Sequence, residues 1–209
     1  LLSALTSNDW RQRYESLTSL TDLFARFPTE ISPRLIKIFD LVNQRLNDVN
    51  SKVQLHAIGC LQSMVPALGW GMEPVLTTLI PALAANLAST NVAVRSGTIS
   101  CFHELSTSVD KSQLLHPYAN VITYGNPRVK PVMLEQLKLL VPEVYHENPS
   151  HTVRCVLPAA VGLLDERKAD IRTANNELLA ALYEVLGEEL FIQPGLSPQN
   201  SERVRAIVA

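Results

Sequence analysis

The chain has few of the cysteines and charged residues that mark several large classes of protein. Its 209 residues include only three cysteines, Cys60, Cys101 and Cys155, whose spacing fits neither a zinc site nor a redox motif. We therefore expect small buried thiols in a reducing compartment. Charged residues make up 18% of the chain and the formal net charge is -2. Because a free-standing nucleic-acid binder is usually basic, we expect no nucleic acid among the partners.

Long apolar runs are missing as well. The nearest candidate, residues 75–88, is shorter than a membrane span and is interrupted by threonine, proline and asparagine. No charged leader precedes Leu1, so we predict no signal peptide. These absences favour a fragment of a cytosolic protein that does not enter a membrane.

Sets of residues that could do chemistry are also absent. The five histidines show no metal-ligand spacing, and we predict no metal site. The glycines form no phosphate-binding loop, so no cofactor is expected. No nucleophile can be matched to a base, and we predict that the chain is not an enzyme.

What the chain does have is a repeated helical pattern. Apolar residues recur at i, i+3, i+4, i+7 and i+11, which places them on one stripe of a helix. The stripes are Leu35, Ile38, Phe39, Val42 and Leu46; Leu76, Leu79, Ile80, Leu83 and Leu87; Val153, Val156, Leu157, Ala160 and Leu164. A shorter stripe contains Leu115, Tyr118, Ala119 and Ile122.

A polar turn follows each of these stripes and leads into a second amphipathic helix. The residue pairs that open the second helices are Gln12-Arg13, Val53-Gln54, Val94-Arg95, Val129-Lys130 and Ile171-Arg172, which lie 41, 41, 35 and 42 residues apart. Most of these steps match the period of HEAT and armadillo repeats. No segment alternates apolar and polar residues as a strand would.

We therefore predict an all-α fold, an α-solenoid of about five to six HEAT repeats that forms one domain over residues 1–209. The first helix would be truncated at Leu1, and a short capping helix would occupy about residues 199–209. A single helix pair cannot bury both of its faces, so stacking of neighbouring repeats must supply the core.

The five turns carry a resemblance to a known family. The segment from Asp9 to Arg13, with its tryptophan, resembles the first turn of TOG domains, the tubulin-binding HEAT arrays of the CLASP, ch-TOG and crescerin families. Ser51-Lys52-Val53, Val94-Arg95, the basic fourth turn and the turn from Asp165 to Ile171-Arg172 are similar too. The third turn lacks the acidic residue that is usual in the family, and the second turn has a single lysine.

The resemblance implies a flat paddle whose turns form one edge that binds αβ-tubulin. The predicted tubulin-binding residues are Trp10, Lys52, Asn91, Arg95, Arg128, Lys130, Arg167, Lys168 and Arg172. As a set, the basic residues suit an acidic partner.

Each of these residues also has a simpler interpretation. Trp10 could plug the end of the first repeat rather than anchor a partner. Arg95 and Arg172 could pair with neighbouring turns, and Lys52, Arg128, Lys130 and Lys168 could be ordinary solvated charge. Asn91 could be a turn or helix-cap residue. We interpret the second tryptophan, Trp70, as a packing anchor between repeats.

Two functions remain open at this point. The first is a monomeric module that binds αβ-tubulin or microtubules and alters polymerisation within an array of such domains. It would work in the cytoplasm on the microtubule cytoskeleton, with the cilium, axoneme and centrosome as further locations. The second is a HEAT scaffold or transport-receptor fragment that binds a protein on its concave helical face. The sequence does not decide between free and lattice tubulin.

Overall fold

The computed structural model describes all residues from Leu1 to Ala209. The chain is helical throughout and contains no strand, which confirms the predicted fold class. It divides into two compact units, residues 1–113 and 114–209, which we describe separately. No helix is long and apolar enough to cross a membrane.

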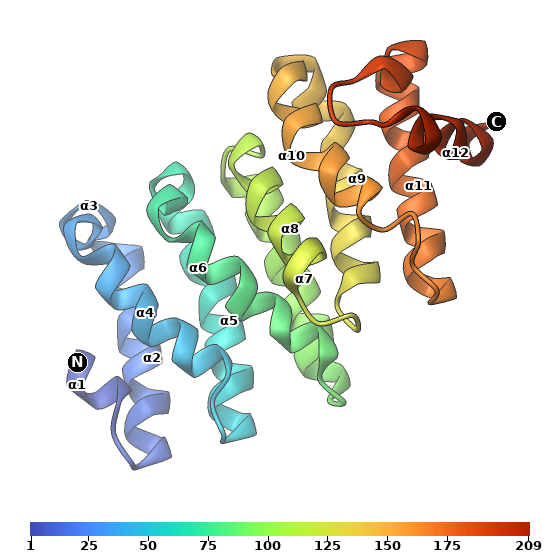
Figure 1. The fold of residues 1–209 in the computed structure, drawn as a ribbon. Helices are drawn as coiled ribbons and strands as arrows, with labels where there is room; N and C mark the ends of the chain where they lie inside the picture. The colour runs from blue at the N-terminus through green and yellow to red at the C-terminus, as the bar shows by residue number, and fades with distance from the viewer. The chain divides into compact units, whose positions relative to one another are not determined.

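The first unit is built from helices that run back and forth in pairs. Its elements are α1 (Leu2–Leu5), α2 (Trp10–Arg26), α3 (Pro28–Ile31), η1 (Ser32–Arg34), α4 (Leu35–Leu46), α5 (Ser51–Leu68), η2 (Gly69–Met72), α6 (Glu73–Ala84), η3 (Ala85–Ala88) and α7 (Val92–Ser108). Helices α2, α5 and α7 pack side by side in one layer, and α4 packs against α6 in the other (Figure 1).

The second unit continues the same pattern. Helix α8 (Ser112–Tyr124) begins at the boundary and is followed by α9 (Lys130–Glu147), α10 (Pro149–Val161), α11 (Ala169–Leu186), η4 (Gly187–Ile192) and α12 (Pro198–Val208). Helix α9 packs along α11 and against α10, and α12 covers α11. Helix α12 is the last element of the chain.

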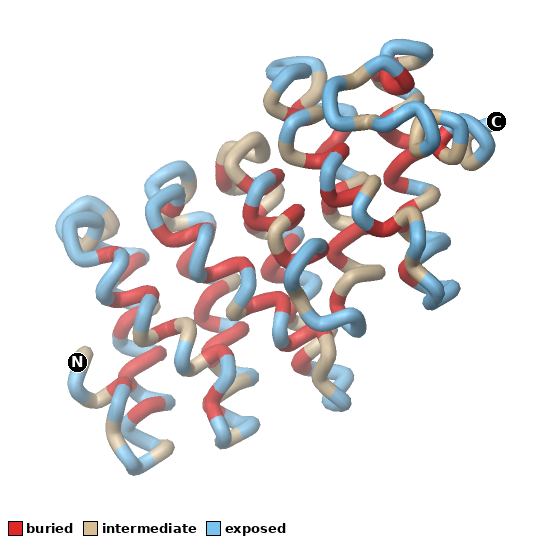
Figure 2. Tube along the Cα trace, in the orientation of Figure 1, coloured by how far each residue is buried: buried red, intermediate tan, exposed pale blue.

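The predicted apolar stripes form the core. Every residue of the stripes that begin at Leu35, Leu76 and Leu115 is buried. In the stripe that begins at Val153, Val156, Leu157 and Ala160 are buried, whereas Val153 and Leu164 are only half-buried. Figure 2 shows the buried residues recurring along each helix while the turns are exposed. The repeat architecture therefore leaves the turns free for other roles.

Candidate binding surface

The polar turns within the repeats are short and are held by their own side chains. In the first unit Asp9, Asn50 and Asn91 cap α2, α5 and α7: each side-chain oxygen accepts a hydrogen bond of 2.9 Å from a backbone N–H two residues later. Such caps satisfy backbone donors that a helix start leaves without partners. The three turns thus have the same local geometry, and each delivers the following residues to the start of a long helix.

The two turns of the second unit use the same chemistry. The side chain of Asn126 accepts a hydrogen bond of 2.9 Å from the backbone N–H of Arg128. A carboxylate oxygen of Glu166 accepts bonds from the backbone N–H groups of Arg167 and Lys168, at 2.8 and 3.0 Å. Arg128 and Arg167, two of the predicted arginines, therefore sit on turns whose backbone is fixed, while their own side chains are exposed.

Trp10 and Lys52 come together in the first unit although 42 positions separate them. The half-buried indole of Trp10 has the guanidinium carbon of Arg11 at 5.1 Å from its ring centroid and the Lys52 ammonium nitrogen at 5.5 Å. Both distances are typical of cation–π contacts. Two predicted site residues, from turns of neighbouring repeats, therefore form one aromatic and cationic cluster.

Arg95 and Lys130 are partly used to fasten their own turns. Arg95 is half-buried, and its Nη1 donates a hydrogen bond of 2.6 Å to the carbonyl oxygen of Ser89. Arg13 makes the equivalent bond to Ser7, at 2.8 Å. The ammonium of Lys130 donates to the carbonyl of Thr123 at 3.4 Å. Arg95 thus has a structural partner, as its simpler interpretation predicts, but this partner lies in its own turn rather than in a neighbouring one.

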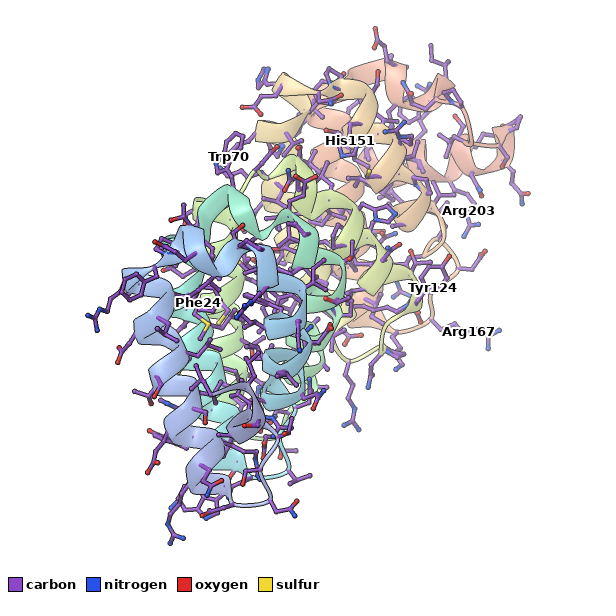
Figure 3. The ribbon with its side chains drawn as sticks, turned by 90° about the vertical axis from the view of Figure 1, so that its left-hand side faces the viewer. Phe24, Trp70, Tyr124, His151, Arg167 and Arg203 are labelled. Carbon is purple, nitrogen blue, oxygen red and sulfur yellow. The ribbon has the colours of Figure 1, made fainter.

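Arg128, Arg167, Lys168 and Arg172 are exposed around the two turns of the second unit. Figure 3 shows Arg167 extending away from the ribbon on the same side as Tyr124. The N–H of Lys168 lowers the pKa of the Glu166 carboxyl, and the charges of Lys130 and Lys168 act in the same direction. Glu166 therefore stays ionised and offsets part of the positive charge of these turns.

Exposed apolar residues on the turns escaped the sequence analysis. Val49 is fully exposed, Val92 is 67% exposed and Tyr124 is 85% exposed. Each lies within or directly beside a turn made of polar residues. That placement is the signal that could have revealed them, because a large apolar side chain in a polar turn has no core to enter. Together with Trp10, they give each of the first four turns one accessible apolar contact.

The interpretation of Trp70 as a packing anchor is wrong. Its side chain is 73% exposed and extends away from the ribbon (Figure 3). The turn of η2 directs the fully buried Met72 into the core instead. Gly69, with φ of 49°, provides the backbone conformation that ends α5 and starts this turn. Apolar character alone did not reveal which residue of this turn would be buried.

Possible metal ligands and reactive thiols are few. Two helical His–Cys pairs that the sequence analysis overlooked, His56 with Cys60 and His151 with Cys155, have side-chain atoms within 3.5 and 3.7 Å. No group of three or more His, Cys, Asp and Glu side chains could hold a metal ion. Cys60 and Cys101 are buried and Cys155 is half-buried. Burial raises the pKa of the Cys101 thiol to about 12, so this thiol is protonated at neutral pH.

Comparison with known proteins points to one kind of domain. No protein-family model matches the chain. The TOG array regulator of axonemal microtubules protein 1 of Mus musculus is 30% identical over 209 residues, and the match covers 95% of this chain. The Homo sapiens protein of the same name is also 30% identical. The chain spans only 12% of the length of these relatives.

Solved structures agree with this comparison. A crescerin structure, described as a TOG domain array that regulates microtubules in the primary cilium, has a TM-score of 0.70 at 18% identity and covers 94% of this chain and 84% of its own. A structure described in terms of TOG–tubulin binding specificity has a TM-score of 0.73 at 15% identity and covers 99% and 79%. The chain thus has the fold of these TOG-domain structures, a HEAT-repeat array, and along 95% of its length it is similar in sequence to a TOG array regulator.

Proposed function

We propose that this domain binds αβ-tubulin through its intra-repeat turns and so takes part in regulating microtubule polymerisation or stability. The observation that carries the proposal is the pairing of one accessible apolar residue with nearby cations on rigid, capped turns. Aromatic and apolar anchors supply most of the binding energy of protein interfaces, and surrounding charges supply orientation and specificity. Binding would be stoichiometric, without a chemical step.

The charges of the turns suit an acidic protein surface. Lys52 and Arg11 flank Trp10 in the first unit, and Arg128, Arg167, Lys168 and Arg172 surround the turns of the second. The mouse and human relatives are named as regulators of axonemal microtubules, which supports a microtubule partner for this chain. We place the domain on cytoplasmic or ciliary microtubules, as one member of an array in which linked copies raise the effective concentration.

The scaffold hypothesis has its own supporting observation. Ile36 on α4 and Leu139 on α9 are 60% and 57% exposed, so two helices also present single apolar side chains. They lie on separate units and are not accompanied by the capped basic turns described above. A partner on the helices would tolerate changes in the turns, and this difference separates the two hypotheses.

The test is co-migration with purified αβ-tubulin on size exclusion at low salt. The wild-type domain should form a complex at tens of micromolar, roughly the weak end of specific affinities. The Lys52→Ala/Arg128→Ala variant should lose most of the complex while its helical circular dichroism is unchanged. If the variant still forms the complex, these two cations are not part of the binding site. If the wild-type domain forms no complex, and microtubule pelleting confirms that it does not bind, the scaffold hypothesis is favoured.

A further inference from the structure

A shallow groove leads from Trp10 onto the face of α2 and α5. One hollow of about 340 Å³ is lined by Trp10, Arg11, Tyr14, Glu15 and Lys52. A second hollow of about 420 Å³ is lined by Tyr14, Lys52, Leu55, His56 and Gly59. Because the two hollows share Tyr14 and Lys52, they form one depression, which we call the α2–α5 groove. It begins at the proposed tubulin contact and continues away from the turns.

The middle of the groove is rigid and partly apolar. The rings of Tyr14 and His56 stack with centroids 3.6 Å apart and planes 9° apart. The Nε2 of His56 also lies 2.8 Å from the hydroxyl oxygen of Thr18. Tyr14 and Leu55 are 37% and 39% exposed, so both remain available for contact. A stack that joins two helices provides a preorganised surface, which lowers the cost of binding.

Gly59 lies at the open end of the groove, although the packing of the fold does not require a glycine there. It lies in the middle of α5, where glycine destabilises a helix by about 0.5–1 kcal/mol relative to alanine. A Cβ at this exposed position would meet no heavy atom within 4 Å. Gly97 on the adjacent α7 differs, since a Cβ there would lie 3.0 Å from the Ile58 side chain. Packing explains Gly97, whereas no packing contact of the fold accounts for Gly59.

We propose that the α2–α5 groove holds an extended acidic segment of the same tubulin partner, so that the interface continues from the turns onto the helices. This inference rests on the proposed function. Two cations, Arg11 and Lys52, face one carboxylate, Glu15, at the turn end of the groove. The excess positive charge favours an acidic segment there. Tyr14 and Leu55 would then contact its apolar side chains, and Gly59 would leave room for its chain.

The test fills the groove without weakening the fold. Gly59→Leu places a side chain in the open space and should preserve or raise the melting temperature, because it replaces a mid-helix glycine. Ser100→Leu is the matched control: Ser100 is exposed on α7 and lies 41 positions later, which is one repeat. Affinity for αβ-tubulin is measured for both variants and wild type by fluorescence anisotropy, with Leu55→Glu as a second groove variant.

We expect Gly59→Leu and Leu55→Glu to weaken tubulin binding by about tenfold, the effect of losing one useful contact region, while Ser100→Leu binds like wild type. If both groove variants bind tubulin with wild-type affinity, the proposal that the groove holds a tubulin segment is wrong, and the turns form the whole interface. A wild-type domain that fails to bind tubulin would instead overturn the proposed function itself, and the groove with it. The two failures are therefore distinguishable.

Discussion

The guanidinium of Arg13 donates two hydrogen bonds of 2.9 Å to the carboxylate of Asp48, which lies 35 residues later in the next repeat. Both side chains are buried. Arg13 also donates to the carbonyl groups of Ser7 and Asn8, while Asp48 accepts from the backbone N–H of Asn50. This bidentate pair joins the turn that carries Trp10 to the turn that precedes Lys52. The cluster proposed to bind tubulin thus rests on a buried ion pair.

Removing one member of that pair should destabilise the first unit strongly. Asp48→Ala leaves the buried charge of Arg13 without its partner, which typically costs about 3–5 kcal/mol. The free energy of unfolding in urea measures the loss. The control is Glu177→Ala, which breaks the exposed contact of Lys138 with Glu177 and should cost at most about 1 kcal/mol. Equal losses in the two variants would show that the buried pair contributes no more to the free energy of unfolding than the exposed one.

The same pair predicts how stability changes with pH. Burial by itself raises the pKa of the Asp48 carboxyl, but the hydrogen bond from Arg13, the N–H of Asn50 and the charges of Arg45 and Arg13 lower it below its ordinary value. A carboxyl with a lowered folded pKa stabilises the fold above its unfolded pKa, about 3.9, and this contribution is lost as pH falls through the folded pKa.

Urea unfolding between pH 6 and pH 3 tests this prediction, with Asp48→Asn as the comparison. The wild type should be more stable than the variant at pH 6, and the gap should narrow as pH falls below about 4. A gap that stays constant over this range would mean that ionised Asp48 is not the source of the difference.

Asn91 was predicted as a binding residue, and its side chain caps α7 by accepting from the N–H of Ala93. Asn91→Ala should therefore reduce the free energy of unfolding by about 1 kcal/mol, whereas Asn91→Ser should keep most of the cap. Tubulin affinity measured on both variants then separates the two roles. Loss of affinity in both would indicate a direct contact, and loss in Asn91→Ala alone would indicate that the cap positions the turn.

Binding to tubulin should weaken as salt is raised. The exposed cations Lys52, Arg128, Arg167, Lys168 and Arg172 contribute to affinity through screened charge attraction. Affinity measured from about 50 to about 300 mM salt should fall steadily, and the fall should be shallower in Lys52→Ala/Arg128→Ala. An affinity that is independent of salt would assign binding to the apolar residues alone.

Much of the fold could be predicted from the sequence because helical periodicity is a local property. The stripe from Leu35 to Leu46 and the pairs that open the second helices repeat at a nearly constant step, and all-α architecture follows from them. Trp10 and Lys52 were predicted separately, but their contact depends on how two repeats stack. Trp70 was misjudged because burial at a turn depends on its backbone path. The open surroundings of Gly59 could not be predicted, since a glycine in a sequence does not show what surrounds it.

The central claim is that the turns, and not the apolar character of the surface in general, bind tubulin. The two tryptophans allow a direct test: Trp10 lies at the first turn beside Lys52, and Trp70 lies exposed on η2. Fluorescence anisotropy would compare the αβ-tubulin affinity of Trp10→Glu and Trp70→Glu with wild type, after circular dichroism confirms both folds. We expect a loss of about tenfold or more for Trp10→Glu and no change for Trp70→Glu. Equal affinities for the two variants, or a loss only in Trp70→Glu, would contradict the central claim.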